Sequence, residues 1–152
     1  MNNIEASFSK NKFQELSELG TRFHLSFSSQ IAIGKTLIAL DGIKKSLLVL
    51  ETDKQPFIIE LNKVASVSVK KTYNSIRPGE LNNKGIEQFL NTIELQFVYT
   101  NNKGTVSLPF YNCGEDDLHN LAMRERNAKN WQMILSKLLI VPANKTIEEQ
   151  QS

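Results

Sequence analysis

The chain has 152 residues, of which 40% are hydrophobic and 22% are charged, and this balance excludes a disordered or fibrous protein. Its formal net charge of +2 is too small to indicate a dedicated nucleic-acid-binding protein. Cys113 is the single cysteine, so the sequence offers neither an internal disulfide nor paired thiols for a zinc site. The first thirty residues hold no apolar run typical of a signal peptide, and no stretch approaches a membrane span. We expect a single-domain, cytoplasmic protein without a cofactor.

The N-terminal segment, residues 1–21, is predicted to be helical. Its apolar residues recur at helical intervals, at Phe8, Phe13, Leu16 and Leu19, and Gly20 is a typical helix stop. We expect this helix to dock on the rest of the chain through the last three of these side chains.

Residues 22–70 are predicted to form five strands joined by short turns. Between residues 22 and 33 apolar side chains alternate with polar ones, which is typical of a half-buried strand, here bent at Ser28 and Ser29. Further strands are expected at 36–40, 47–51, 57–61 and 64–70. Connections this short require antiparallel pairing, since a parallel crossover needs a dozen or more residues.

Residues 72–90 interrupt this pattern. They carry Pro78, Gly79 and Gly85, and predict a long loop with one helical turn at 86–90. Loops of this length are uncommon in compact domains and are often functional. A hairpin follows, with alternating strands at 93–99 and 106–110 around a turn at 101–104, which brings the expected strands to seven.

The last element is predicted to be an amphipathic helix from Asp116 or Asp117 to Leu139. Its apolar residues fall into two groups, Ala128, Trp131, Leu135 and Leu138 on one face and Leu118, Leu121 and Ala122 on another. We expect the two groups to meet different surfaces. Pro142 stops the helix, and residues 141–152 are expected to form a disordered tail.

This order of elements resembles the pleckstrin-homology-like superfold. Residues 36–51, TLIALDGIKKSLLVLE, are similar to its second and third strands, and residues 57–61 and 64–69 are similar to the next pair. Trp131, followed by Ile134 and Leu138, is similar to the tryptophan of the closing helix. The resemblance covers residues 22–140 and implies a bacterial-type, seven-stranded antiparallel barrel or sandwich closed by a C-terminal amphipathic helix. A large aromatic on a helix is also a suitable cover for the open end of a small barrel.

Enzymatic motifs are weak in this sequence. Residues 33–36 resemble the end of a phosphate-binding loop, but the required first glycine is replaced by Ser29 and the preceding residues form a strand pattern. Cys113, Asp116 and His119 are potential metal ligands within the stretch YNCGEDDLH. We interpret this stretch as a loop leading into an acidic helix start and assign no catalytic or metal-binding residue. A small metal-dependent enzyme is the third-ranked hypothesis.

Basic side chains support a second hypothesis, weak binding to an anionic membrane surface through Lys44, Lys45, Lys70 and Lys71. Many pleckstrin-homology domains bind inositol phosphates through several basic residues of the first hairpin. The corresponding residues 30–37 contain only Lys35, so we expect its replacement by alanine to leave lipid association unchanged.

The preferred hypothesis is a non-enzymatic binding or scaffold module that recognises a protein or peptide and not a nucleic acid. The resemblance implies a groove between the fifth strand and the closing helix, where an extended peptide adds as a strand. The candidate binding residues are Ser66, Ser68, Lys70, Lys71, Tyr73, Ile76, Arg77 and Phe89. In the alternative interpretation, the loop at 72–90 covers the edge of its own strand.

Overall fold

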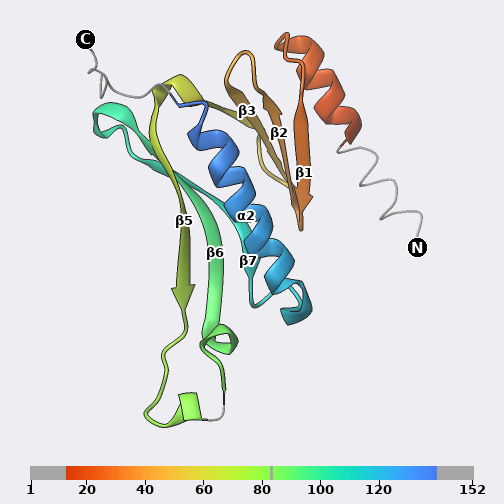
Figure 1. Cartoon of the computed structure of the whole chain (residues 1–152). Helices are drawn as coiled ribbons and strands as arrows, with labels where there is room; N and C mark the ends of the chain where they lie inside the picture. Colours follow the sequence, from red (N-terminus) through yellow and green to blue (C-terminus); the bar gives the residue numbers. More distant parts are fainter. Residues whose placement is uncertain (1–12, 83, 140–152) are drawn as a thin grey trace, which may run out of the picture. The chain divides into compact units, whose positions relative to one another are not determined.

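The computed structural model of the chain describes residues 13–82 and 84–139. These residues form two compact units that divide between Asn62 and Lys63 (Figure 1). The expected tail at 141–152 and the part of the N-terminal helical segment before residue 13 lie outside the described residues.

The first unit contains a four-stranded antiparallel sheet in the order β1-β2-β3-β4. Its strands are β1 (Ser29–Ile33), β2 (Thr36–Asp41), β3 (Ser46–Glu51) and β4 (Phe57–Glu60). The three later strands confirm the predicted meander to within one residue at each end. The runs LIAL and LLVL, residues 37–40 and 47–50, are apolar without alternation and all buried, as expected for strands buried on both faces.

A helix over residues 13–22 covers one face of this sheet. Leu16 and Leu19 pack on the cross-strand pairs Leu37–Leu50 and Ala39–Leu48, and Phe27 and Ile58 border the cluster. The predicted docking through Leu16 and Leu19 is therefore confirmed, whereas Phe13 is 45% exposed.

The predicted helix stop at Gly20 and the predicted strand start at Arg22 are wrong. The helix continues through residue 22, and strand β1 begins only at Ser29. The linking residues turn at His24, which has a φ of 57°. Gly20 serves packing instead, because a Cβ atom there would lie 2.9 Å from the ring of Phe27.

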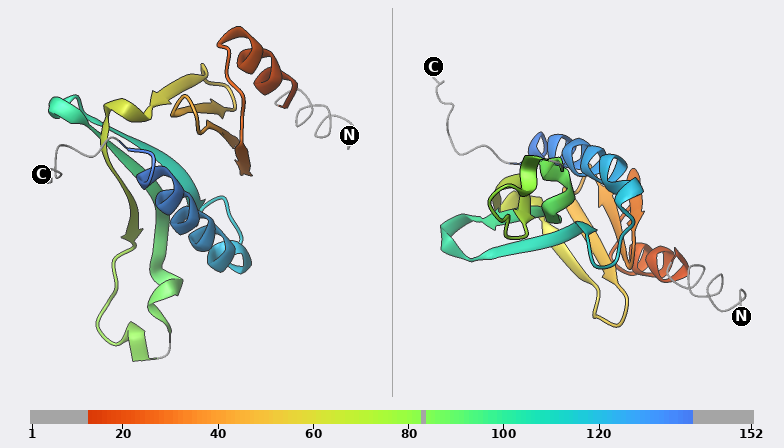
Figure 2. Two further views of the ribbon diagram at one scale, coloured as in Figure 1. Left: turned by 45° about the horizontal axis from the view of Figure 1, so that its top comes forward. Right: turned by 90° about the horizontal axis from the view of Figure 1, so that it is seen from below.

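The second unit contains a three-stranded antiparallel sheet in the order β5-β6-β7. Its strands are β5 (Val64–Tyr73), β6 (Leu90–Tyr99) and β7 (Thr105–Asn112), each longer than predicted. Strands β5 and β6 form a long hairpin whose connecting residues continue beyond the strand ends and past the helix α2 (Figures 1 and 2). Short 3-10 turns at Glu80–Asn82 and Ile86–Phe89 lie within this connection.

Helix α2 (Leu121–Ser136) packs on all three strands of this sheet. Its buried residues Leu121, Ala128, Trp131 and Leu135 form one stripe. Leu118 and Ala122 are exposed, so the expectation that a second apolar group meets a different surface is wrong. The helix also starts later than predicted, because Asp116 and Asp117 accept backbone hydrogen bonds in the preceding turn and lie outside it.

The seven expected strands are thus present in two antiparallel sheets of four and three strands, followed by the C-terminal helix. The strand pairings among the described residues do not close the sheets into a barrel.

Candidate functional site

Strand β5 is an edge strand, because β6 is its only neighbour among the strands that the structure describes. The direction of its backbone groups follows from β6. On β6, the carbonyl of Asn91 accepts from Cys113 and the N–H of Tyr99 donates to Gly104, so odd-numbered β6 residues point their backbone groups toward β7. The even-numbered β6 residues from 92 to 98 therefore turn their backbone groups toward β5, and their partners there are Thr72, Lys70, Ser68 and Ser66.

The remaining β5 residues, Val67, Val69 and Lys71, point their N–H and C=O groups away from β6. One contact confirms this direction: the side-chain amide Nε2 of Gln132 on α2 lies 3.2 Å from the carbonyl oxygen of Val67 and donates to it. Gln132 also lies 3.4 Å from the hydroxyl of Ser136, one helical turn further on. The open edge of β5 thus runs beside the helix.

An ion-pair group crosses between the same two elements at the far end of the strand. The ammonium of Lys71 binds the carboxylate of Glu125, which also lies 3.0 Å from the ammonium of Lys129. The hydrogen bond to Lys71 lowers the pKa of Glu125, and the same bond raises the pKa of Lys71. Val69 lies between this group and Gln132, and its side chain is half-buried.

The predicted site residues on β5 divide between two faces. Val67 is buried and Lys71 reaches α2, so side chains at 67, 69 and 71 face the helix. Ser66, Ser68 and Lys70 are exposed on the opposite face, across from Val98, Gln96 and Glu94 of β6. The serines therefore lie outside the groove that they were expected to line.

The other predicted residues lie at the far end of the hairpin. Tyr73 and Arg77 are exposed, Ile76 is half-buried and Phe89 is buried. The carbonyl of Phe89 accepts from the N–H of Asn74 at 2.7 Å, which closes the hairpin. Because the connection extends away from the strand ends (Figure 1), it does not cover the edge of β5, as the alternative interpretation expected.

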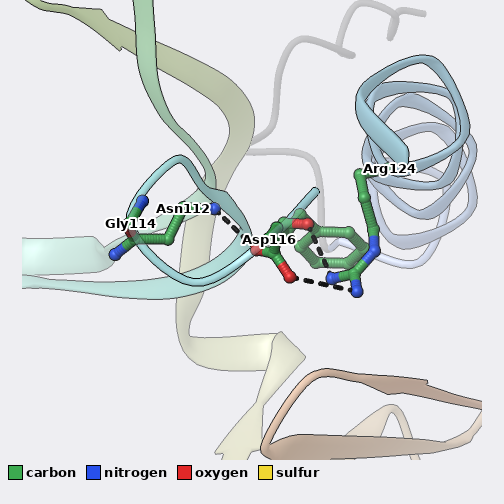
Figure 3. Close-up of polar contacts among 5 residues, drawn as sticks. Asn112, Gly114, Asp116 and Arg124 are labelled. Atoms are coloured by element: carbon green, nitrogen blue, oxygen red, sulfur yellow. Dashed lines mark hydrogen bonds and ion pairs between the residues drawn. The ribbon is translucent and has the colours of Figure 1, made fainter. Parts of the chain in front are cut away.

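The turn between β7 and α2 shows what the YNCGEDDLH stretch does. The carboxylate of Asp116 accepts from the N–H of Asn112 at 2.8 Å and pairs with the guanidinium of Arg124 at 3.2 Å (Figure 3). Arg124 also donates to the carbonyl of Phe110. Both charged side chains are about 15% exposed, and the group ties the end of β7 to the first turns of α2.

The three potential metal ligands of this stretch do not converge. Cys113 is exposed and contacts Asn91, Asp116 is occupied by Arg124, and His119 contacts Asp117 with 93% of its side chain exposed. No group of three or more His, Cys, Asp or Glu side chains suited to a metal ion occurs within residues 13–82 and 84–139.

The phosphate-loop resemblance at residues 33–36 also has a structural explanation. Gly34 and Lys35 are the two residues between β1 and β2, and Gly34 adopts a φ of 57° at the first central position of this tight hairpin. The sequence pattern therefore arises from a hairpin turn and not from a loop leading into a helix.

Gln132 and Glu125 are the residues that the sequence did not single out. Both are ordinary polar positions on an amphipathic helix, and each contacts a strand more than fifty positions earlier in the chain. Comparison of the chain with protein-family models, with curated proteins and with solved structures found no match. Within the described part of the chain, no helix is long and apolar enough to cross a membrane.

Proposed function

We propose that this chain is a non-enzymatic, pleckstrin-homology-like module that binds an extended peptide as an added strand along the open edge of β5. The observation that carries the proposal is the hydrogen bond from Gln132 to Val67. An amide on the helix already donates to an outward carbonyl of this strand, at the position where the backbone of an added strand would donate.

A comparison of the edge strands supports β5 as the binding edge. Short edge strands and prolines are common devices that prevent unwanted strand pairing. Strands β1 and β4 have only five and four residues, and β7 carries Pro109 within it. Strand β5 has ten residues and no proline. The features that oppose strand pairing along it are the charged side chains of Lys70 and Lys71 and the contacts with the helix.

The element order supports the fold part of the proposal. Two antiparallel sheets of four and three strands followed by one amphipathic helix match the order of the pleckstrin-homology-like superfold. The matched elements include the helix and the strand between which the peptide would lie.

The test begins with selection of binding peptides from a random twelve-residue displayed library against the full chain. Their dissociation constants are then measured for the wild type and for two variants, Val69→Pro and Val69→Thr. Proline removes the outward N–H of Val69 without removing a hydrogen bond to β6, and edge strands tolerate it. Threonine keeps the N–H and the β-branched shape.

We expect Val69→Pro to weaken binding of the selected peptides at least tenfold and Val69→Thr to change it less than threefold. Amide resonances of Val67, Val69 and Lys71 should shift on peptide addition. Peptides that bind Val69→Pro as tightly as the wild type would contradict the proposal, and so would a library without binders to any form of the chain.

The membrane hypothesis gains little from the contacts of its lysines. Lys71 is paired with Glu125, and the ammonium of Lys44 donates to the carbonyl of His24. Two of the four lysines that were expected to face a lipid surface therefore have partners within their own units.

A further inference from the structure

Gln132 occupies one position on the open edge of β5. Its side-chain amide is an uncharged N–H donor like that of a peptide group, and it donates to the Val67 carbonyl at 3.2 Å. The side chain is half-buried and also donates to the hydroxyl of Ser136. A strand that pairs along the whole edge must donate its own N–H to the same carbonyl.

Of the two contacts between α2 and the edge of β5, the hydrogen bond of Gln132 is easier to break than the ion pair of Lys71. At the other end of the edge, Lys71 uses its side chain to bind Glu125, and this leaves the outward backbone groups of residue 71 clear of the ion pair. Gln132 instead uses its side chain on the backbone itself. A neutral hydrogen bond that is exchanged for an equivalent one costs little, whereas separating the ion-pair group would expose charge.

We infer that Gln132 is a built-in competitor for the peptide edge: it holds the Val67 carbonyl in the free protein and must swing away before an added strand can pair there. This inference rests on the proposed strand addition along β5. It predicts that removing the amide strengthens peptide binding, which is the opposite of the usual effect of deleting a polar side chain beside a ligand. An intramolecular hydrogen bond of this kind contributes a factor of about three to ten to the equilibrium.

The experiment compares Gln132→Met with the wild type, using the library-selected twelve-residue peptides as the probe. Methionine keeps the length and the packing of glutamine but has no amide donor. Asn130→Met is the matched control, because Asn130 is an exposed polar residue on the same helix. Gln132→Ala is the second variant, and thermal unfolding checks that each variant folds.

We expect both Gln132 variants to bind the peptides about three- to tenfold more tightly and Asn130→Met to bind within twofold of the wild type. Unchanged or weaker binding to both Gln132 variants would overturn the inference while leaving the proposed function intact, provided that Val69→Pro still weakens binding at least tenfold. If peptides are selected only against Gln132→Met, the competitor role is supported in its strongest form. If no form of the chain selects a peptide, both proposals fail together.

Discussion

Asp41 is the buried carboxylate that organises the first unit, with 2% of its surface exposed. One oxygen accepts from the N–H groups of Ile43 and Lys44 in the β2–β3 turn, and the other accepts from the N–H of Ser26. It therefore joins the segment that follows the first helix to the turn between two strands. The N–H of Lys44 is the main reason that the pKa of Asp41 lies below its ordinary value of 3.8.

We predict that Asp41→Asn destabilises the protein by about 1–3 kcal/mol at pH 7, because the amide offers one acceptor where two are used. A carboxyl whose pKa is lower in the folded state stabilises the fold above its unfolded pKa, and this contribution is lost as the pH falls through the folded pKa. Urea unfolding at pH 7 and below pH 4 should therefore show a smaller acid-induced loss for the variant. Asp53→Asn, at an exposed turn, is the control; equal pH dependence of Asp41→Asn and the wild type would contradict this role.

Arg124 joins the first turns of helix α2 to the end of strand β7. Its guanidinium pairs with Asp116 and also donates to the Phe110 carbonyl. Removing one partner of a mostly buried ion pair leaves the other charge uncompensated, so Arg124→Met should cost about 3 kcal/mol in the free energy of unfolding. Arg124→Lys should restore less than half of this loss, because one ammonium cannot reproduce the two directions of the guanidinium. Full restoration by lysine would show that charge alone matters there.

Trp131 is the large aromatic side chain through which helix α2 packs on its sheet. It is 7% exposed and belongs to the single buried stripe of a helix that packs on three strands. Trp131→Ala should lower the free energy of unfolding by about 3–5 kcal/mol, since the removed indole leaves a cavity. Met133→Ala, at an exposed position of the same helix, should change it by less than about 0.5 kcal/mol. A loss below 1 kcal/mol in urea unfolding of Trp131→Ala would mean that the helix does not depend on this side chain.

The elements that the sequence predicted well are those in which local pattern and tertiary environment agree. The central residues of β2 and β3, 37–40 and 47–50, are apolar and buried, and the turn between the two strands is short. Residues 23–28 alternate as a strand would, but the N–H of Ser26 is bonded to Asp41 and the backbone at His24 is left-handed. The contact with Asp41 has no local sequence pattern, and together with the turn at His24 it overrides the alternation.

The candidate site was predicted in outline and missed in detail for a similar reason. The resemblance to a known element order indicated the groove between the fifth strand and the helix. The contacts of Gln132 and Glu125 with β5 join residues more than fifty positions apart and have no local sequence pattern. The orientation of β5 did have one, because Val67 and Val69 alternate with Ser66 and Ser68 and the apolar side chains turn toward the helix. The choice of the serines as groove residues did not follow this pattern.

At the scale of the whole molecule, intermolecular contacts should concentrate on residues 64–90. The other edges are short or carry a proline, and the hairpin adds three exposed apolar side chains, Tyr73, Leu81 and Ile86. Such side chains are compatible with the centre of a protein interface.

Hydrogen exchange of the full chain, at low and high protein concentration and with a selected peptide, measures this directly. We expect protection to increase at the amides of Val67, Val69 and Lys71 and along residues 74–89 more than in β1, β4 or β7. The even-numbered β5 amides serve as an internal control, because their pairing with β6 protects them in every condition. If the three outward amides are already as protected as these neighbours in the dilute free protein, the edge is closed and no strand can be added there.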